Sequence, residues 1–239
     1  MVIRKISGRP EITGISSMAT RNMLVQLVEE YERLSQQHVA VESVGGVAAF
    51  QRVLEGAPFD FVVLAAEAID RLAAAGRVES GSRVDLARSG VSIAVAAGAP
   101  RPEIGNEQAV CDAILAARSI GYSTGPSGAY LSRLFDRWGI ANILAPRIVQ
   151  APSGVPVGTL VASGEAELGF QQLSEFMHLP GIDIIGSLPP EIQVITVFSA
   201  AICTTGTTAE SADAAKSLLS FLQSSRADST KLSHGMEPA

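Results

Sequence analysis

Short apolar runs alternate with amphipathic segments along most of the chain. Apolar residues recur at helical spacing across residues 18–37, and a continuous apolar run, FVVLAA, occupies residues 61–66. The first pattern predicts an amphipathic helix and the second a buried strand. Because this order repeats, the sequence predicts the α/β class, with parallel sheets covered by helices on both faces.

The same reasoning places the other elements. Strands are predicted at residues 11–17, 38–44, 59–66, 91–98, 119–124, 146–151, 166–172, 182–189 and 195–203. Helices are predicted at 18–37, 45–56, 67–78, 108–117, 127–140, 155–165 and 211–225. A Pro-rich loop at 99–108 interrupts the rhythm, and no repeat of roughly 20–50 residues stands out, so a solenoid is not expected.

Composition narrows the class of function. The 239 residues suit one large domain or two lobes, and 47% hydrophobic with 18% charged residues argue against a disordered chain. The net charge of −6 and pI of about 5.1 argue against nucleic-acid binding, which needs a basic surface. No apolar run approaches about 18 residues, so no transmembrane helix is expected.

The first 18 residues carry no apolar stretch of roughly 7–15 residues after their basic residues, so they do not resemble a secretory signal. As the sequence stands, the predicted location is the cytoplasm. If a signal peptide has been removed, the prediction changes to the periplasm.

Four junctions between a strand and a helix share small and hydroxyl-bearing residues: GISSMATRNML (14–24), ESVGGVAAFQRVL (42–54), GYSTGPSGAYLSRLF (121–135) and APSGVPVGTL (151–160). A helix start offers free N–H groups and the positive end of the helix dipole. Ordinary N-capping without a ligand would select the same residues. Since ligands of open α/β sheets bind beyond the carboxyl ends of the strands, four such junctions predict a site for an anion.

Several kinds of site lack their motifs. The sequence has no GxxxxGKS or GxxxxGKT loop, no dinucleotide fingerprint, no GxSxG elbow and no HExxH pair. His38, His178 and His234 stand in unrelated contexts, so neither a metal site nor a cofactor is predicted. Cys111 and Cys203 have no CxxC spacing; we interpret them as small buried hydrophobes, with a disulfide left open.

A predicted strand ends in two amides, Gln171 and Gln172, followed by Ser174 and Glu175. Amides at a strand end can orient a polar ligand. Equally, the strand end could be solvated, with Ser174 capping a helix.

The chain resembles the substrate-binding proteins of ABC transporters, in the group of periplasmic molybdate-binding proteins. GISSM followed by a helix is similar to that family's first oxyanion loop, and residues 121–140 are similar to its third loop and helix. The more specific matches are GAPFD at 56–60 and GEAELGF at 164–170, and HGMEP at 234–238 is similar to the C-terminal signature.

The resemblance implies a type II periplasmic-binding-protein-like fold: two α/β lobes joined by two crossing hinge strands, with an anion in the cleft between them. Carried over, the crossings fall near 87–92 and 194–200. Lobe one comprises 1–87 and 200–239, and lobe two comprises 88–199. An ABC permease is the implied protein partner.

The resemblance also implies ligand-binding positions. They are Ser16, Ser17, Met18, Gly45, Gly46, Val47, Thr124, Ser127, Gly128, Val155, Pro156 and either Gln171 or Gln172. Two positions depart from the molybdate-binding pattern: VGGV replaces serines in the second loop, and the Gln pair replaces a tyrosine. Fewer hydroxyls favour an organic acid over tetrahedral molybdate.

Two functions follow from these observations. The first is a binding protein that captures a small oxyanion or carboxylate through backbone amides and hydroxyls and needs no general base. The alternative is an isomerase of a tricarboxylic acid, since aconitate isomerase resembles the same family. That reaction requires proton transfer, for which the candidate groups are Tyr122, Glu42, Glu175 and His178.

Overall fold

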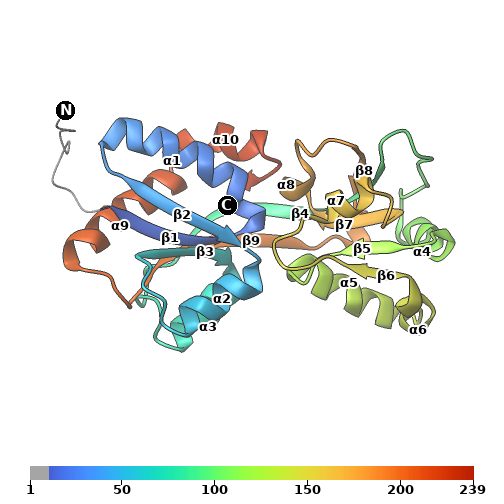
Figure 1. The fold of residues 1–239 in the computed structure, drawn as a ribbon, viewed down its shortest axis with the longest axis horizontal. Coiled ribbons are helices and arrows are strands. Elements are labelled where there is room, and N and C mark those ends of the chain that lie inside the picture. The colour runs from blue at the N-terminus through green and yellow to red at the C-terminus, as the bar shows by residue number, and fades with distance from the viewer. Residues whose placement is uncertain (1–10) are drawn as a thin grey trace. The chain divides into compact units, whose positions relative to one another are not determined.

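The computed structural model describes residues 11–239, coloured along the chain in Figure 1. Of the first 18 residues considered above, residues 1–10 lie outside the described residues. The chain divides into two compact units: the described residues up to Ala87 with Val197–Ala239, and Arg88–Thr196. Strands β4 (Val84–Ala96) and β9 (Ile195–Ile202) each run from one unit into the other.

The first unit is built on the parallel strands β1 (Ile12–Ser17), β2 (Val39–Val44) and β3 (Phe61–Ala65). Strand β1 lies between the other two, and β9 pairs with β3 in the antiparallel direction. The helices of this unit are α1 (Arg21–Ser35), α2 (Gly46–Leu54), α3 (Ala66–Ala74), α9 (Ala209–Gln223) and α10 (Asp228–Ser233). Shorter elements are the 3-10 helices η1 (Met18–Thr20) and η4 (Ser225–Ala227) and strand β10 (Glu237–Pro238), which pairs with β4.

Two hydrophobic layers enclose the sheet of this unit, because successive side chains of a strand face opposite sides. Ile12 of β1 packs with α1 and α9, whereas Ile15 packs with α2 and α3. Gly14 lies directly over the ring of Phe61, and a Cβ there would overlap the ring. The alternation in β1 therefore produces the predicted arrangement of helices on both faces.

The second unit contains the remaining strands, β5 (Ile120–Tyr122), β6 (Ile148–Gln150), β7 (Leu168–Gln172) and β8 (Ile182–Ser187). Strand β5 pairs in parallel with β6 and β7, while β7 and β8 pair antiparallel with β4. The helices are α4 (Glu107–Ala116), α5 (Pro126–Arg137), α6 (Ala141–Leu144), α7 (Val157–Ala162) and α8 (Leu173–Phe176), with 3-10 helices η2 (Ala145–Arg147) and η3 (Pro190–Ile192).

The α/β class is confirmed, but the prediction of parallel sheets is wrong: both sheets are mixed. The antiparallel partners are β9 in the first unit and β4 in the second, and each is the strand by which the chain enters that unit. Strand β4 also begins seven residues before the predicted 91–98, because Asp85, Arg88 and Ser89 hide its apolar pattern.

The two cysteines differ in their surroundings. In the described part of the chain both are free thiols; Cys203 is buried, whereas Cys111 is half-buried. Our interpretation of two buried residues is therefore correct for Cys203 only, because Cys111 lies on the surface helix α4.

Candidate functional site

Two helix starts of the first unit lie at the same edge of its sheet. Strand β1 ends at Ser17 and leads into η1, and β2 ends at Val44 just before α2 begins at Gly46. Ser17 and Val44 are register partners in neighbouring parallel strands. A Cβ on Gly46 would lie 3.6 Å from Cβ of Ser17, so the predicted residues of loops one and two are close in space.

The hydroxyl of Ser17 is buried and has no hydrogen-bond partner within residues 11–239. Its neighbour Ser16 is engaged internally, because its Oγ lies 2.8 Å from Oγ of Ser43 on β2. An unpaired buried hydroxyl costs about 1–3 kcal/mol. Ser17 therefore offers a hydrogen bond to a ligand oxygen, next to the start of α2.

The helices that follow the four predicted junctions begin in a similar way. In α1, α2, α5 and α7, the N-cap side chain accepts no hydrogen bond from the described helix, and no acidic residue occupies the first turn. By contrast, α4 is capped by Asn106 and α9 by Thr208, and each has a glutamate in its first turn. A capping side chain at the N-cap position therefore does not account for the four junctions. The N–H of Val157 at the start of α7 is bound by Gln171, so the helix ends left to attract an anion are those at the first three junctions.

The third junction packs tightly against its own helix. Gly125 precedes α5, and its N–H donates to Oγ of Ser123 at 3.3 Å. A Cβ on Gly128 would overlap the carbonyl oxygen of Ser123, so only glycine allows the loop to lie against the first turn. Of the two predicted hydroxyls here, Thr124 is exposed and Ser127 is buried.

Tyr122 is half-buried at the end of β5. Its ring meets that of Phe135 edge-on, with 6.1 Å between centroids. Burial raises the pKa of its phenol above the ordinary value. A phenol of raised pKa is a poor base at neutral pH, so this geometry favours a packing role.

The fourth junction is bound by a side chain from β7. The Oε1 of Gln171 accepts a hydrogen bond from the N–H of Val157, the first residue of α7, at 2.8 Å. The Nε2 of the same amide donates to Oε1 of Glu175 at 2.7 Å. Burial raises the pKa of the Glu175 carboxyl to about 7, although the hydrogen bond from Gln171 acts in the opposite direction. Val155 and Pro156 precede this helix start.

The other amide, Gln172, joins three strands within the second unit. It lies 2.9 Å from Oγ1 of Thr196 on β9. With its oxygen towards that hydroxyl, its nitrogen donates to the carbonyl of Ser89 at 2.9 Å and to that of Gly90 at 3.2 Å on β4. Both amides are buried and make hydrogen bonds within the protein. The final ligand position at Gln171 or Gln172 therefore stays a prediction.

The two other proton-transfer candidates, Glu42 and His178, are both exposed. Glu42 is exposed and pairs with Arg52, its oxygens 2.5 and 2.9 Å from the guanidinium nitrogens, which lowers the pKa of the carboxyl. His178 is exposed and has a backbone φ of 66°. Of these four candidates, Glu175 is therefore the group suited to exchanging a proton at neutral pH.

The alternative in which Ser174 caps a helix is wrong. The N-cap of α8 is Gln172, and the buried hydroxyl of Ser174 has no partner in the described structure. One residue that the sequence did not single out is Arg21, which is exposed at the first position of α1. It carries no sequence signal, because a lone arginine near a helix start is common.

Two further findings concern what residues 11–239 do not contain. They include no group of three or more histidine, cysteine, aspartate or glutamate residues able to hold a metal ion. No helix in this range has the length and apolar character needed to cross a membrane.

Comparisons with known proteins agree with this arrangement. Residues 12–237 match the family model described as bacterial extracellular solute-binding protein. The chain is 36% identical over 233 residues to an aconitate isomerase from Pseudomonas sp., covering 95% of this chain and 87% of the relative.

Solved structures of similar fold include oxyanion-binding proteins. The periplasmic molybdate-binding protein of Azotobacter vinelandii has a TM-score of 0.76 at 24% identity, over 94% of this chain and 98% of that one. The sulfate-binding protein of Mycobacterium tuberculosis H37Rv has a TM-score of 0.74 at 18% identity, over 96% and 87%. The fold is therefore that of the type II periplasmic binding proteins.

Proposed function

Because the chain belongs to the family of bacterial extracellular solute-binding proteins, we propose that it binds a small organic anion with several carboxylates. In this proposal the anion is held in the first unit, at the starts of α1 and α2. The carrying observation is that these helix starts lack both side-chain caps and acidic residues, beside the hydroxyl of Ser17, which has no partner in the described structure. The cleft between two lobes, implied by the family resemblance, stays a prediction.

The second loop supports an organic ligand over an inorganic one. Gly45 and Gly46 offer backbone N–H groups without hydroxyls, and Val47 leaves 60% of its surface exposed at the start of α2. An exposed apolar side chain beside N–H donors suits a ligand that has both carboxylates and a hydrocarbon skeleton. The 36% identity to an aconitate isomerase supports the tricarboxylate class.

A calorimetric titration tests this proposal. The protein is titrated with cis-aconitate, trans-aconitate, citrate, sulfate and molybdate at pH 7.5. We expect measurable heat and saturation with at least one tricarboxylate, and weaker binding of the inorganic anions. Binding of molybdate or sulfate alone would contradict the polycarboxylate assignment, and binding of none of the five would contradict the function.

A second candidate function is isomerisation of the bound tricarboxylate, as in an aconitate isomerase. Two observations favour it. The chain is 36% identical to an aconitate isomerase over 95% of its length, and burial raises the pKa of the Glu175 carboxyl to about 7. Moving the double bond removes a proton from one carbon of aconitate and returns a proton to another, so no oxidant is needed. A carboxyl of pKa about 7 is suited to both steps.

The test of this second function is direct. The protein is incubated with trans-aconitate in deuterium oxide, and the products are followed by proton NMR. We expect cis-aconitate to form and deuterium to enter the carbon skeleton, with the rate strongly reduced in Glu175→Gln. Tight binding of trans-aconitate without any cis isomer would leave the binding function and exclude the isomerase.

Location and partner follow from the family and form part of the proposal. A solute-binding protein acts outside the cytoplasm and delivers its ligand to an ABC permease. Cell fractionation of the producing bacterium tests the location, and co-purification with a permease in the presence of ligand tests the partner. Recovery of the native protein from the cytoplasm alone would favour the isomerase.

A further inference from the structure

We infer that Arg21 binds a second carboxylate of the ligand and so selects polycarboxylates over inorganic oxyanions. This inference rests on the proposed function and adds a specificity-determining residue to it. It depends on three properties of Arg21: its place four residues after Ser17 at the carboxyl end of β1, the lack of a partner for its guanidinium within residues 11–239, and its position one turn into the helix that begins after Ser17.

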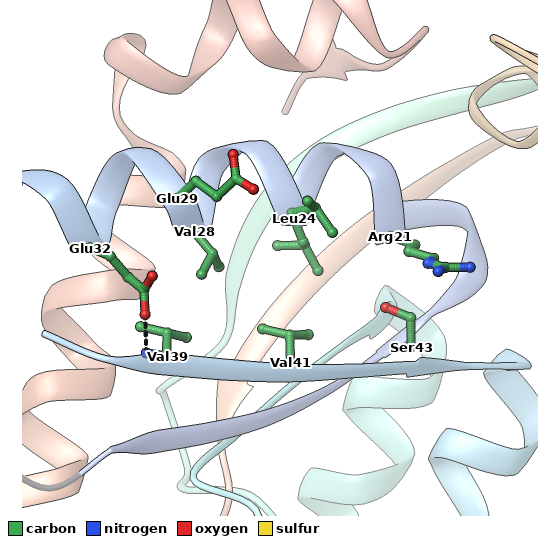
Figure 2. Close-up of a pocket in the computed structure, with 9 residues that line it drawn as sticks. Arg21, Leu24, Val28, Glu29, Glu32, Val39, Val41 and Ser43 are labelled. Carbon is green, nitrogen blue, oxygen red and sulfur yellow. Dashed lines mark hydrogen bonds between the residues drawn. The ribbon is translucent and has the colours of Figure 1, made fainter.

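Arg21 lies near the carboxyl ends of β1 and β2 in the first unit. It is the first residue of α1 and follows η1, which begins directly after Ser17. Figure 2 shows Arg21 and Ser43 at one end of a groove between α1 and β2, with Glu32 and Val39 at the other end. The hydroxyl of Ser43 is 2.8 Å from that of Ser16, so Arg21 and the serine pair belong to the same end of the strand pair.

The guanidinium of Arg21 is unpaired. Among residues 11–239 it makes no ion pair or hydrogen bond, whereas Arg52, Arg83 and Arg137 each meet a carboxylate at 2.5–2.6 Å. Its nearest acidic neighbours along the groove are Glu29 and Glu32, which lie about 12 and 16 Å farther along the helix axis. Glu32 also accepts a hydrogen bond from the N–H of Val39 at 2.8 Å.

The position of Arg21 opposes the helix dipole. A cation is unfavourable at a helix N-terminus and favourable in the last turn, where α1 carries Arg33. The N–H of Arg21 donates to the carbonyl of Met18 in η1, so Arg21 lies one turn inside a helix that begins after Ser17. Folding gains nothing from a cation so near this end of the helix. A ligand carboxylate between the helix N–H groups and the guanidinium would make the arrangement favourable.

The chemistry of the guanidinium points to a carboxylate. Its planar fork binds a carboxylate through two parallel hydrogen bonds. A compact oxyanion satisfied by N–H groups and the Ser17 hydroxyl has no second group for Arg21 to bind. A tricarboxylate has such a group, so Arg21 distinguishes the two classes of ligand.

Arg21→Gln tests the inference, with Arg33→Gln as the matched control. Both variants remove one positive charge from α1, but residue 33 lies about 18 Å farther along the helix, well beyond the screening length of about 8 Å at physiological salt. Calorimetry of the full chain compares citrate and cis-aconitate with sulfate. We expect Arg21→Gln to weaken tricarboxylate binding by about tenfold or more. Sulfate binding, and all binding by Arg33→Gln, should stay within about twofold.

Other results would overturn the inference in distinguishable ways. Unchanged tricarboxylate affinity in Arg21→Gln would refute the contact while leaving the proposed function intact. Equal weakening for sulfate and citrate would refute the selectivity. If the unaltered protein binds no anion, the proposed function fails and the inference with it. Because Arg21 is exposed, the melting temperature should not fall, and Arg21→Lys should give intermediate affinity.

Discussion

The side chains of Gln171 and Glu175 are joined by a hydrogen bond of 2.7 Å, from the amide nitrogen to the carboxyl oxygen. The amide cannot reverse without losing its second bond, because its oxygen accepts from the N–H of Val157. Glu175 is thereby connected through one side chain to the start of α7. Of the candidate groups, this carboxyl is the best suited to acid-base chemistry. Its hydrogen bond to Gln171 connects it to the start of α7 in the second unit.

The Glu175 carboxyl should make stability depend on pH. Its pKa is raised from 4.5 to about 7 in the folded chain, so folding favours the protonated form. Its contribution is fully present below about pH 4.5 and is lost as pH rises to about 7. We expect Glu175→Gln to match the unaltered protein near pH 4.5 and to exceed its free energy of unfolding by about 3 kcal/mol at pH 8. Urea unfolding across this range measures the difference, and parallel curves would contradict the prediction.

Replacing Ser17 should separate stability from binding. Ser17→Ala removes a buried hydroxyl that has no partner in the described structure, so the free energy of unfolding should stay unchanged or rise by up to about 1 kcal/mol. Anion affinity should fall by about five- to tenfold, because a ligand hydrogen bond is lost.

The control for Ser17→Ala is Thr208→Ala, which removes the cap of α9. That variant should lose about 1 kcal/mol of stability and keep its affinity. Calorimetry and urea unfolding on the same samples give both quantities. A Ser17→Ala variant that is destabilised but binds normally would show that the hydroxyl serves the fold.

A negative charge at the start of α2 should weaken anion binding. Val47 is exposed there, so Val47→Glu fits sterically and complements the helix dipole, with stability raised by a few tenths of a kcal/mol. The carboxylate takes the place of the anion, and affinity should fall by at least about tenfold. Val47→Gln keeps the size without the charge, and Ala209→Glu adds the same charge to the start of α9. Equal affinity of Val47→Glu and Val47→Gln would argue against a site at this helix.

Two glycines of the third junction should differ sharply. A Cβ at Gly128 would overlap the Ser123 carbonyl, and Gly128→Ala should cost at least about 2 kcal/mol of stability. At Gly125 the nearest atom would be Oγ of Ser123 at 3.4 Å, so Gly125→Ala should change stability by less than about 1 kcal/mol. Thermal unfolding compares the two variants. Similar losses of stability in the two variants would mean that the Ser123 carbonyl does not lie against the first turn of α5.

The sequence predicted the helix starts because Ser, Thr and Gly mark them locally. It could not show which hydroxyl is free. Whether Ser16 or Ser17 is paired depends on Ser43, which is 27 residues away and becomes a neighbour only through strand register. Similarly, the partner of Gln171 is a backbone N–H 14 residues earlier. Such contacts depend on packing rather than local pattern.

The mixed sheets were missed for a related reason. Helices between strands predict parallel neighbours, and that holds for β1, β2 and β3. Strand β9, however, pairs with β3 although 129 residues separate Ala65 from Ile195 in the numbering. The relative direction of strands so far apart in the sequence depends on the path of the whole chain. Hydrophobic periodicity, which is a local pattern, carries no information about that path.

We propose that the uncapped helix starts near Ser17 bind a polycarboxylate. Titration of the unaltered protein and of Val47→Glu with cis-aconitate, in one calorimetric series at pH 7.5, tests it most directly. We expect saturable binding by the unaltered protein and at least about tenfold weaker binding by Val47→Glu at equal or higher stability. Equal affinity in the two proteins, or no binding of any polycarboxylate by the unaltered one, would contradict it.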